Sequence, residues 1–172
     1  MTTTTFFHLG ILVRSLDEAI PRFGQLLGTS FVAPKPLEIA HLVDVEHFGD
    51  DRPHPWSGRC TYSREGPPYY ELIEAKGRGL FSLDNRDEGL HHVGLLVDDP
   101  HGLQADLADQ GVRARARILR GPDGPTGVWF SHGPSLHGVP FEFIDGDSRP
   151  RLESRWSIGP LLVTPVRSAP SP

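Results

Sequence analysis

A short phrase occurs twice in this chain, and its repetition limits the possible folds more than any other feature. The first copy spans residues 7–13 (FHLGILV) and the second spans residues 91–97 (HHVGLLV). Each copy predicts an apolar strand that carries a histidine, and each precedes a helix-like stretch that ends at Gly28 or Gly111. Because self-similarity within one chain indicates a duplicated unit, we interpret the protein as two related halves.

The similarity extends to the last strand of each half. Glu71 lies in the apolar run 70–73 and Glu142 in the run 141–144, so each half contributes one carboxylate as well as one histidine. Burying such side chains is costly unless they have partners. If the halves pair about a pseudo-two-fold axis, we expect the two histidines and the two glutamates to face one another. They are His8, Glu71, His92 and Glu142.

The composition is that of an ordinary globular chain. The protein has 172 residues, a net charge of -5 and a pI near 6.0. This balance argues against nucleic-acid binding, which needs a basic face, and no apolar run approaches the roughly 20 residues of a membrane span. The single cysteine, Cys60, rules out an internal disulfide and fits a reducing compartment. We therefore expect a cytoplasmic protein with no nucleic-acid and no membrane partner.

The order of predicted elements is a strand, a helix and about three strands, repeated once. Ser15 should cap the first helix, which ends before Gly28, and Asp98 or Asp99 should cap the second, at 100–110. Residues 37–48 alternate well enough to predict a single strand. Strand periodicity places His91 on the side covered by the helices, opposite to the side that carries His92.

These patterns predict an α+β protein in which helices cover one face of a mixed sheet. We place an N-terminal module at residues 5–80 and a C-terminal module at 88–148, joined by a polar linker, within a single structural domain. A proline-rich tail follows at 149–172. We expect its segment 156–163 to dock on the domain and its last residues to be disordered.

The four paired side chains point to metal binding. A lone histidine on a strand is more often a structural residue, and it is the repetition that favours a ligand role. Imidazole and carboxylate together suit Zn, Ni, Co, Fe(II) or Mn(II), so we expect one divalent metal ion. A cation would also explain glutamates within apolar strands, because unpaired burial raises the pKa of a carboxyl group until it is neutral.

The same segments resemble the metal-ligand motifs of the vicinal oxygen chelate superfamily, which includes glyoxalase I, methylmalonyl-CoA epimerase and extradiol dioxygenases. The similar stretches begin at His8 (HLGILV), Glu71 (ELIEA), His92 (HVGLLVDD) and Gly138 (GVPFE), and the resemblance covers roughly residues 6–145. The epimerase and glyoxalase branch is the most similar, and it includes the stretch 62–68 (YSREGPP). One departure is the turn 133–138 (GPSLHG), where family members often carry Asp-Pro-Asp-Gly.

The resemblance implies a fold and a ligand set. The fold would be two paired βαβββ modules that form an open, curled mixed β-barrel around one divalent ion, with the helices outside. The ion would be held by His8, Glu71, His92 and Glu142. The substrate would be a small molecule with a carbonyl or vicinal oxygens, acyl-CoA thioesters included, and the protein would be a homodimer.

The resemblance also implies a choice of proton acceptor. In a glyoxalase-like mechanism Glu71 or Glu142 would leave the metal and act as the base. In an epimerase-like mechanism a further carboxylate assists, and Glu46 is the candidate, although a solvated strand residue is the more frequent role for such a side chain. The four-ligand set argues against an extradiol dioxygenase, which resembles a site of two histidines and one carboxylate.

Two functions remain open from the sequence. The first is a metal-dependent isomerase, epimerase or lyase that abstracts a proton next to a carbonyl while the metal stabilises the enolate. The alternative is a metal-free protein that binds a drug or antibiotic on the same fold. Relatives of the second kind usually lack the complete ligand set, so the presence of all four residues favours the enzyme.

Overall fold

The computed structural model describes residues 4–84 and 86–158. The first half contains β1 (Thr4–Val13), α1 (Leu16–Leu27), β2 (Lys35–Ile39), β3 (Leu42–Asp44), α2 (Val45–Phe48), β4 (Trp56–Tyr62) and β5 (Tyr69–Glu74). The second contains β6 (Gly89–Val97), α3 (Pro100–Asp109), β7 (Ala114–Leu119), β8 (Thr126–Ser131) and β9 (Phe141–Asp145), and α4 (Arg149–Trp156) follows. Every helix in these ranges is too short to cross a bilayer, since the longest has 12 residues and a span needs about 20.

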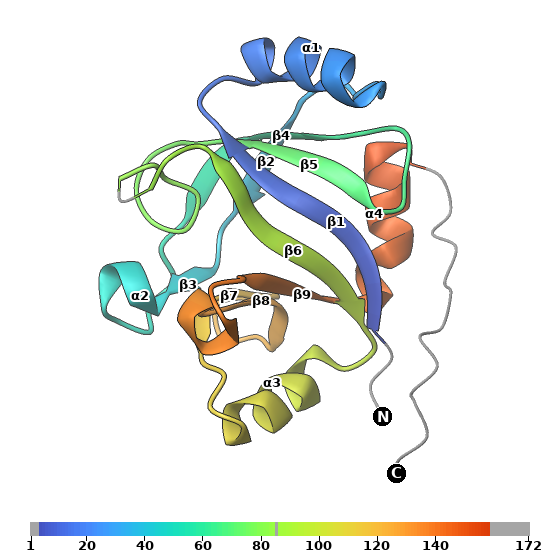
Figure 1. Ribbon diagram of the computed structural model, residues 1–172. Coiled ribbons are helices and arrows are strands. Elements are labelled where there is room, and N and C mark those ends of the chain that lie inside the picture. Colours follow the sequence, from blue (N-terminus) through green and yellow to red (C-terminus); the bar gives the residue numbers. More distant parts are fainter. Residues whose placement is uncertain (1–3, 85, 159–172) are drawn as a thin grey trace.

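The nine strands of the described residues belong to one curled sheet in the order β2-β4-β5-β1-β6-β9-β8-β7-β3 (Figure 1). The two halves meet at the antiparallel pair β1 and β6, in the middle of the sheet. On either side the arrangement is repeated, because β5 runs parallel to β1 and β9 runs parallel to β6. The halves therefore pair within one chain, and the expected α+β fold of two paired βαβββ modules in an open, curled barrel is confirmed.

The two main helices begin and end where the sequence predicts. The side chain of Ser15 accepts a hydrogen bond from the backbone of Glu18, and Gly28 ends α1 with a φ of 64°. In the second half the carboxylate of Asp99 caps α3, and Gly111 follows the helix with a φ of 84°. Both glycines adopt the left-handed conformation that side chains with a Cβ disfavour.

The main apolar core lies inside the sheet, and α1 and α3 pack on its outer side. Residues of both halves share the inner core, among them Phe7 and Phe130. Leu16 of α1 packs against Leu72 in a separate outer cluster. The corresponding outer cluster of the second half includes Trp129 and side chains of α3. The inner side of the sheet is therefore the side on which both halves can present functional groups to each other.

Residues 37–48 do not form the single strand that their alternation predicts. The segment turns at residues 40–41, so that β2 pairs with β4 at one edge of the sheet and β3 pairs with β7 at the other. A straight strand cannot reach both edges of a curled sheet, and this bend nearly closes the barrel. The chain then enters the short helix α2, where the carboxylate of Asp44 accepts a hydrogen bond from the backbone of His47.

Two β-bulges interrupt the pairing of β1 with β6, one at Phe7 and the other at His91. At each bulge one strand has an extra residue, so the alternation of sides shifts by one position. The ring of His91 consequently lies against Phe81 and Phe130 of the inner core, with centroid distances of 5.3 and 6.3 Å. The prediction that His91 faces the helix-covered side is wrong, because simple alternation does not allow for the bulge.

The segments outside the strands contribute more to the core than their composition suggests. Leu80, the last residue of the predicted N-terminal module, and Phe81, the first of the linker, are buried in the inner core. The start of the tail forms α4, whose Trp156 packs on Tyr62 with ring centroids 5.0 Å apart. Residues 159–172 lie outside the described residues. They include the rest of the segment that we expect to dock and the last residues, which we expect to be disordered, so both expectations stay predictions. The module boundaries at 5–80 and 88–148 stay a proposal.

Candidate metal centre

The four candidate ligands lie on the four central strands, β5, β1, β6 and β9, in two neighbouring rows across the sheet. The rows are Glu71–Gly10–His92 and His8–Gly94–Glu142. In each row a glycine of one central strand separates a glutamate from a histidine. Exchanging the two halves converts one row into the other, which is the pseudo-two-fold relationship that the repeated phrase suggests.

Gly10 and Gly94 provide the space that the histidine of the opposite half occupies. A Cβ at position 10 would lie 2.1 Å from Cε1 of His92, and a Cβ at position 94 would lie 2.3 Å from Cε1 of His8. Real Cβ atoms essentially never approach another atom within 3.0 Å. The repeated His-x-Gly spacing therefore means that each half supplies one imidazole and the room for the other.

The four side chains converge on one point. One donor atom from each lies within 4.8 Å of the other three. Nε2 of His8 is 2.8 Å from Nε2 of His92, and it is 3.3 and 3.0 Å from Oε2 of Glu71 and Glu142. Nε2 of His92 is 3.4 and 3.2 Å from the same two oxygens. All four residues are at most 9% exposed.

This arrangement fits a divalent cation. Two buried carboxylates carry two negative charges, which neutral histidines cannot balance. Oε2 of Glu142 has no hydrogen-bond partner among the described residues, although it points at both imidazoles. Bonds of about 2.0–2.2 Å to one ion hold neighbouring ligand atoms roughly 3 Å apart. The histidine–histidine and histidine–glutamate separations, 2.8–3.4 Å, match that spacing.

Protonation of the histidines is the alternative way to balance the carboxylates. Burial alone would lower the pKa of His8, but the negative charges of Glu71 and Glu142, 3.3 and 3.0 Å from its Nε2, raise it to about 9. Burial alone would raise the pKa of each glutamate, and the adjoining histidines hold both values below the usual range. Protons and a metal ion therefore compete for the same nitrogen atoms.

A chain of hydrogen bonds sets which nitrogen of His92 faces the cluster. Nε2 of His91 lies 2.8 Å from the carbonyl oxygen of Leu80, which can only accept, so this nitrogen carries a proton. Burial lowers the pKa of His91 well below its ordinary value, so the ring is neutral and its Nδ1 accepts a hydrogen bond. Nδ1 of His92, 2.8 Å away, is the donor, and Nε2 of His92 directs its lone pair into the cluster.

Tyr62 orients the glutamate of the first half. Its hydroxyl donates to Oε1 of Glu71 over 2.6 Å, which leaves Oε2 directed at the two imidazoles. The residue is 4% exposed, and burial raises its pKa well above the ordinary value, so it remains a donor. Sequence reasoning assigned no role to Tyr62 or to His91. The signals available were the His-His doublet and a tyrosine on the strand before Glu71.

Glu46 does not join the cluster. It lies on α2 rather than on a strand, and its carboxylate pairs with Arg115 at 3.7 Å and with His132 at 3.4 Å. It lines a second, polar cavity together with Arg86, whereas three of the four candidate ligands line a different one. The strand expected at this position is absent because the chain turns at residues 40–41.

The cluster lies at the side of a cavity of about 380 Å³. Glu71, His92 and Glu142 line it, and most of the remaining wall is apolar. Helix α4 contributes Trp156 to the wall. A volume of this order and an apolar wall with a few polar groups are typical of small-molecule sites.

A family model described as the glyoxalase/bleomycin resistance protein/dioxygenase superfamily matches residues 7–130. Comparison with curated protein sequences gives no significant match. Among solved structures, a variant of Streptomyces coelicolor methylmalonyl-CoA epimerase in complex with 2-nitronate-propionyl-CoA is similar with a TM-score of 0.58 and 22% identity, covering 83% of this chain and 97% of that one. Methylmalonyl-CoA epimerase from Mycobacterium tuberculosis has a TM-score of 0.55 and 23% identity over 87% and 91% of the two chains. A hypothetical protein from Bacillus halodurans has a TM-score of 0.58 and 21% identity over 83% and 94%.

Proposed function

We propose, from the premise that this chain belongs to the glyoxalase/bleomycin resistance protein/dioxygenase superfamily, that it is a metal-dependent enzyme that removes a proton next to a carbonyl group. Isomerases, epimerases and lyases share this step. The observation that carries the proposal is the convergence of two buried histidines and two buried glutamates beside an apolar cavity.

His8, Glu71, His92 and Glu142 would hold the ion. When bound, a divalent metal supplies Lewis-acid stabilisation of the negative charge that develops on a substrate oxygen. The apolar wall excludes water from the reacting group, which strengthens that stabilisation.

Glu142 is the better placed of the two glutamates to act as the base. Oε1 of Glu71 is held by the hydroxyl of Tyr62, whereas Oε2 of Glu142 has no hydrogen-bond partner among the described residues. A carboxylate without such an anchor can turn toward a proton on the substrate with less loss of hydrogen bonding. In this assignment Glu142 accepts the proton at Oε2 and Glu71 keeps its position. Glu46, in its separate cavity, has no part in the step.

The substrate would be a small molecule with a carbonyl or neighbouring oxygens. The similar epimerase structure that holds an acyl-CoA analogue supports testing acyl-CoA thioesters first, with 2-oxo compounds as the second group. A homodimer and a cytoplasmic location complete the proposal.

The experiment measures metal content by elemental mass spectrometry on protein purified without a histidine tag or chelator. Its matched sample is the double variant His8→Ala/Glu142→Ala. We expect near one equivalent of a divalent transition metal in the native chain and almost none in the variant. The loaded protein is then incubated with acyl-CoA and 2-oxo compounds in deuterated water, and exchange of the proton beside the carbonyl is followed by nuclear magnetic resonance.

The Glu142→Gln variant separates metal binding from proton transfer. An amide oxygen can still occupy a ligand position, but it cannot take up the proton, so exchange should fall by about 100-fold or more. Absence of metal from the native chain, even after reconstitution, would rule out the proposal in favour of a metal-free binding protein.

A further inference from the structure

We propose that the cavity takes an amphipathic organic anion, whose apolar body lies along the inner wall and whose anionic group binds Arg151 of α4. The inference rests on the proposed function only in naming this anion as the substrate. The shared chemistry is a carboxylate, sulfonate or phosphate attached to an apolar body.

The wall of the cavity has two chemically different parts. The part next to the cluster is apolar and includes Ile73, Phe81 and Ile144. The part formed by α4 contributes two cationic residues, Arg151 and Arg155. A ligand that satisfies both parts needs an apolar segment and a negative charge.

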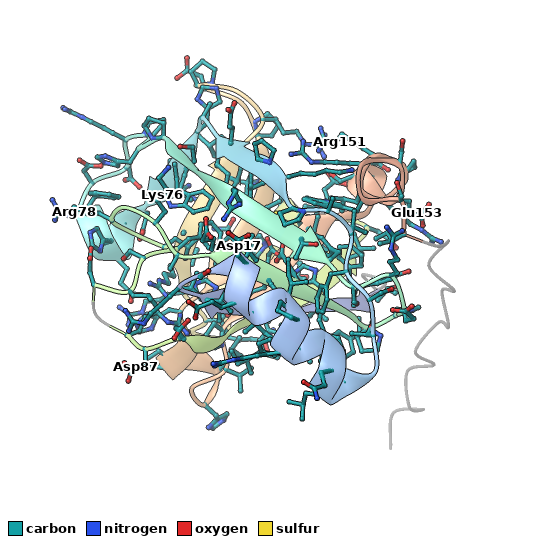
Figure 2. All side chains as sticks on the ribbon, turned by 90° about the horizontal axis from the view of Figure 1, so that it is seen from above. Asp17, Lys76, Arg78, Asp87, Arg151 and Glu153 are labelled. Atoms are coloured by element: carbon teal, nitrogen blue, oxygen red, sulfur yellow. The ribbon has the colours of Figure 1, made fainter. Side chains whose placement is uncertain are left out.

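Arg151 is the guanidinium that is free to bind a ligand. Arg155 already donates to the carbonyl of Pro36 at the edge of β2, so it anchors the helix. For Arg151 the structure shows one long hydrogen bond, 3.5 Å to Oγ of Ser148, and no carboxylate within ion-pair distance among the described residues. In Figure 2, Arg151 lies on the side of α4 toward the sheet and Glu153 on the outer side.

The position of Arg151 also marks where the ligand leaves the inner cavity. An adjoining cavity of about 420 Å³ shares Arg151 with the first, together with Ile118, Leu119 and Val128. Arg151 therefore lies between an inner space that meets the candidate metal centre and a second space that is also lined by Arg120 and Asp147. A molecule whose reacting end is at the cluster would carry its anionic group at this boundary.

The other charges around the two cavities nearly cancel. The first cavity has one further carboxylate, that of Glu38, and the second has that of Asp147. Glu71 and Glu142 are balanced by a divalent ion when one is bound. Arg120 is paired with Asp145. The attraction for an anion therefore comes from the guanidinium of Arg151, which has no ion-pair partner among the described residues, and not from an excess of positive charge.

The experiment compares two fluorescent probes that differ in one charged group. They are 8-anilinonaphthalene-1-sulfonate and N-phenyl-1-naphthylamine, which has the same aromatic skeleton without the sulfonate. Each is titrated into the native chain, Arg151→Gln, Arg151→Lys and the control Arg14→Gln. Arg14 is exposed, pairs with Glu88 and lines neither of the two cavities, so its replacement changes the net charge equally without changing the site.

We expect Arg151→Gln to raise the dissociation constant of the sulfonate probe about fivefold, because an accessible ion pair contributes up to about that factor. The neutral probe should change less than about twofold, and Arg151→Lys, which keeps the charge, should lie between the native chain and Arg151→Gln. Leu152→Trp, which narrows the inner cavity from the same helix, should weaken both probes. Three results would overturn the inference. The dissociation constants of both probes could change equally in Arg151→Gln, Arg14→Gln could weaken the sulfonate probe as much as Arg151→Gln does, or neither probe could bind the native chain.

These titrations need neither turnover nor a particular metal, so their result is independent of the test of the proposed function. If the protein binds the sulfonate probe selectively but holds no metal, the anion site is supported and the proposal of a metal-dependent enzyme is rejected. If it binds metal and exchanges the proton but shows no selectivity at Arg151, the enzyme is supported and the anion site is rejected.

Discussion

The imidazole of His8 lies over the backbone of Gly94, in the space where any other residue would carry its Cβ. The two residues face each other across β1 and β6, and a Cβ at position 94 would be 2.3 Å from Cε1 of His8. The same relationship joins His92 to Gly10. The glycine of each repeated phrase is therefore part of the candidate site, although it carries no functional group.

Gly94→Ala should displace the His8 ring and remove most of the metal binding. Overpacking of a filled interior typically costs about 1–3 kcal/mol, so the free energy of unfolding should fall by that amount. Metal content and denaturant unfolding measure the two effects. The matched control is Gly121→Ala, where an added Cβ meets nothing within 4 Å. Full metal content in Gly94→Ala would contradict this account of the repeated glycine.

His91→Phe should weaken metal binding while the protein remains folded. The equivalent bulge of the first half contains Phe7, so a phenyl ring is compatible with this position of the sheet. The variant loses the acceptor that fixes Nδ1 of His92 as a donor, and loss of such a partner typically lowers metal affinity about 10–100-fold. Competition against a chromophoric chelator measures the affinity, and the absorption of the cobalt-substituted protein reports a changed imidazole. An unchanged affinity and spectrum would show that His91 only fills space.

Tyr62→Phe should destabilise the protein and loosen Glu71. The phenol donates to a charged, buried acceptor over 2.6 Å, and such a hydrogen bond contributes about 1.5–3 kcal/mol. Metal affinity should fall as well, because Oε1 of Glu71 is then free to turn. Tyr70→Phe is the control, since its hydroxyl has no hydrogen bond in the part of the chain that the structure describes. If both variants lose the same stability, the hydrogen bond to Glu71 has no particular importance.

The pH dependence of stability should have opposite signs in the metal-free and metal-loaded protein. The pKa of His8 is raised from 6.5 to about 9, so the metal-free protein holds this proton more tightly than the unfolded chain does. The resulting stabilisation is fully present below about pH 6.5 and is lost as the pH rises through about 9. Metal requires the unprotonated ring, so metal affinity should increase over the same interval.

Thermal unfolding from about pH 6 to about pH 9.5, with chelator and with saturating metal, tests this prediction. In His8→Gln the pH dependence over this interval should be smaller in the metal-free protein. A metal-free protein that gains stability through this interval would show that the two carboxylates do not govern His8.

Removal of metal should lower the melting temperature. A ligand at about 1,000 times its dissociation constant stabilises the native state by about 4 kcal/mol, which for a chain of this size corresponds to roughly 10 °C. Scanning calorimetry with and without a chelator measures the shift. The His8→Ala/Glu142→Ala variant should show no shift, and a native chain that is equally insensitive would favour a metal-free binding protein.

Several features of the fold were predictable because they are local. The repeated phrase predicted two related halves, and Ser15, Gly28 and Gly111 marked helix ends, because caps act within a few residues of chain. The sequence left the second N-cap open between Asp98 and Asp99, and the structure shows Asp99. The pairing of the four ionisable residues could also be expected, since a duplicated chain places equivalent residues in equivalent positions. Their role as metal ligands stays a proposal.

The tertiary structure decided what depends on contacts between distant segments. A bulge adds a residue that period-two alternation cannot reveal, and it turns His91 inward to connect Leu80 with His92. The bend after β2 moves Glu46 onto a helix, because the segment must pair with both edges of a curled sheet.

Two further features at the site also required the assembled structure. The hydrogen bond from Tyr62 to Glu71 depends on how β4 lies against β5. The place of Arg151 at the cavity depends on how α4 docks on the sheet. Sequence alone determined which groups the two halves would share. The orientation of each group was set by strand register, bulges and helix docking, because these depend on the contacts of the whole assembled sheet.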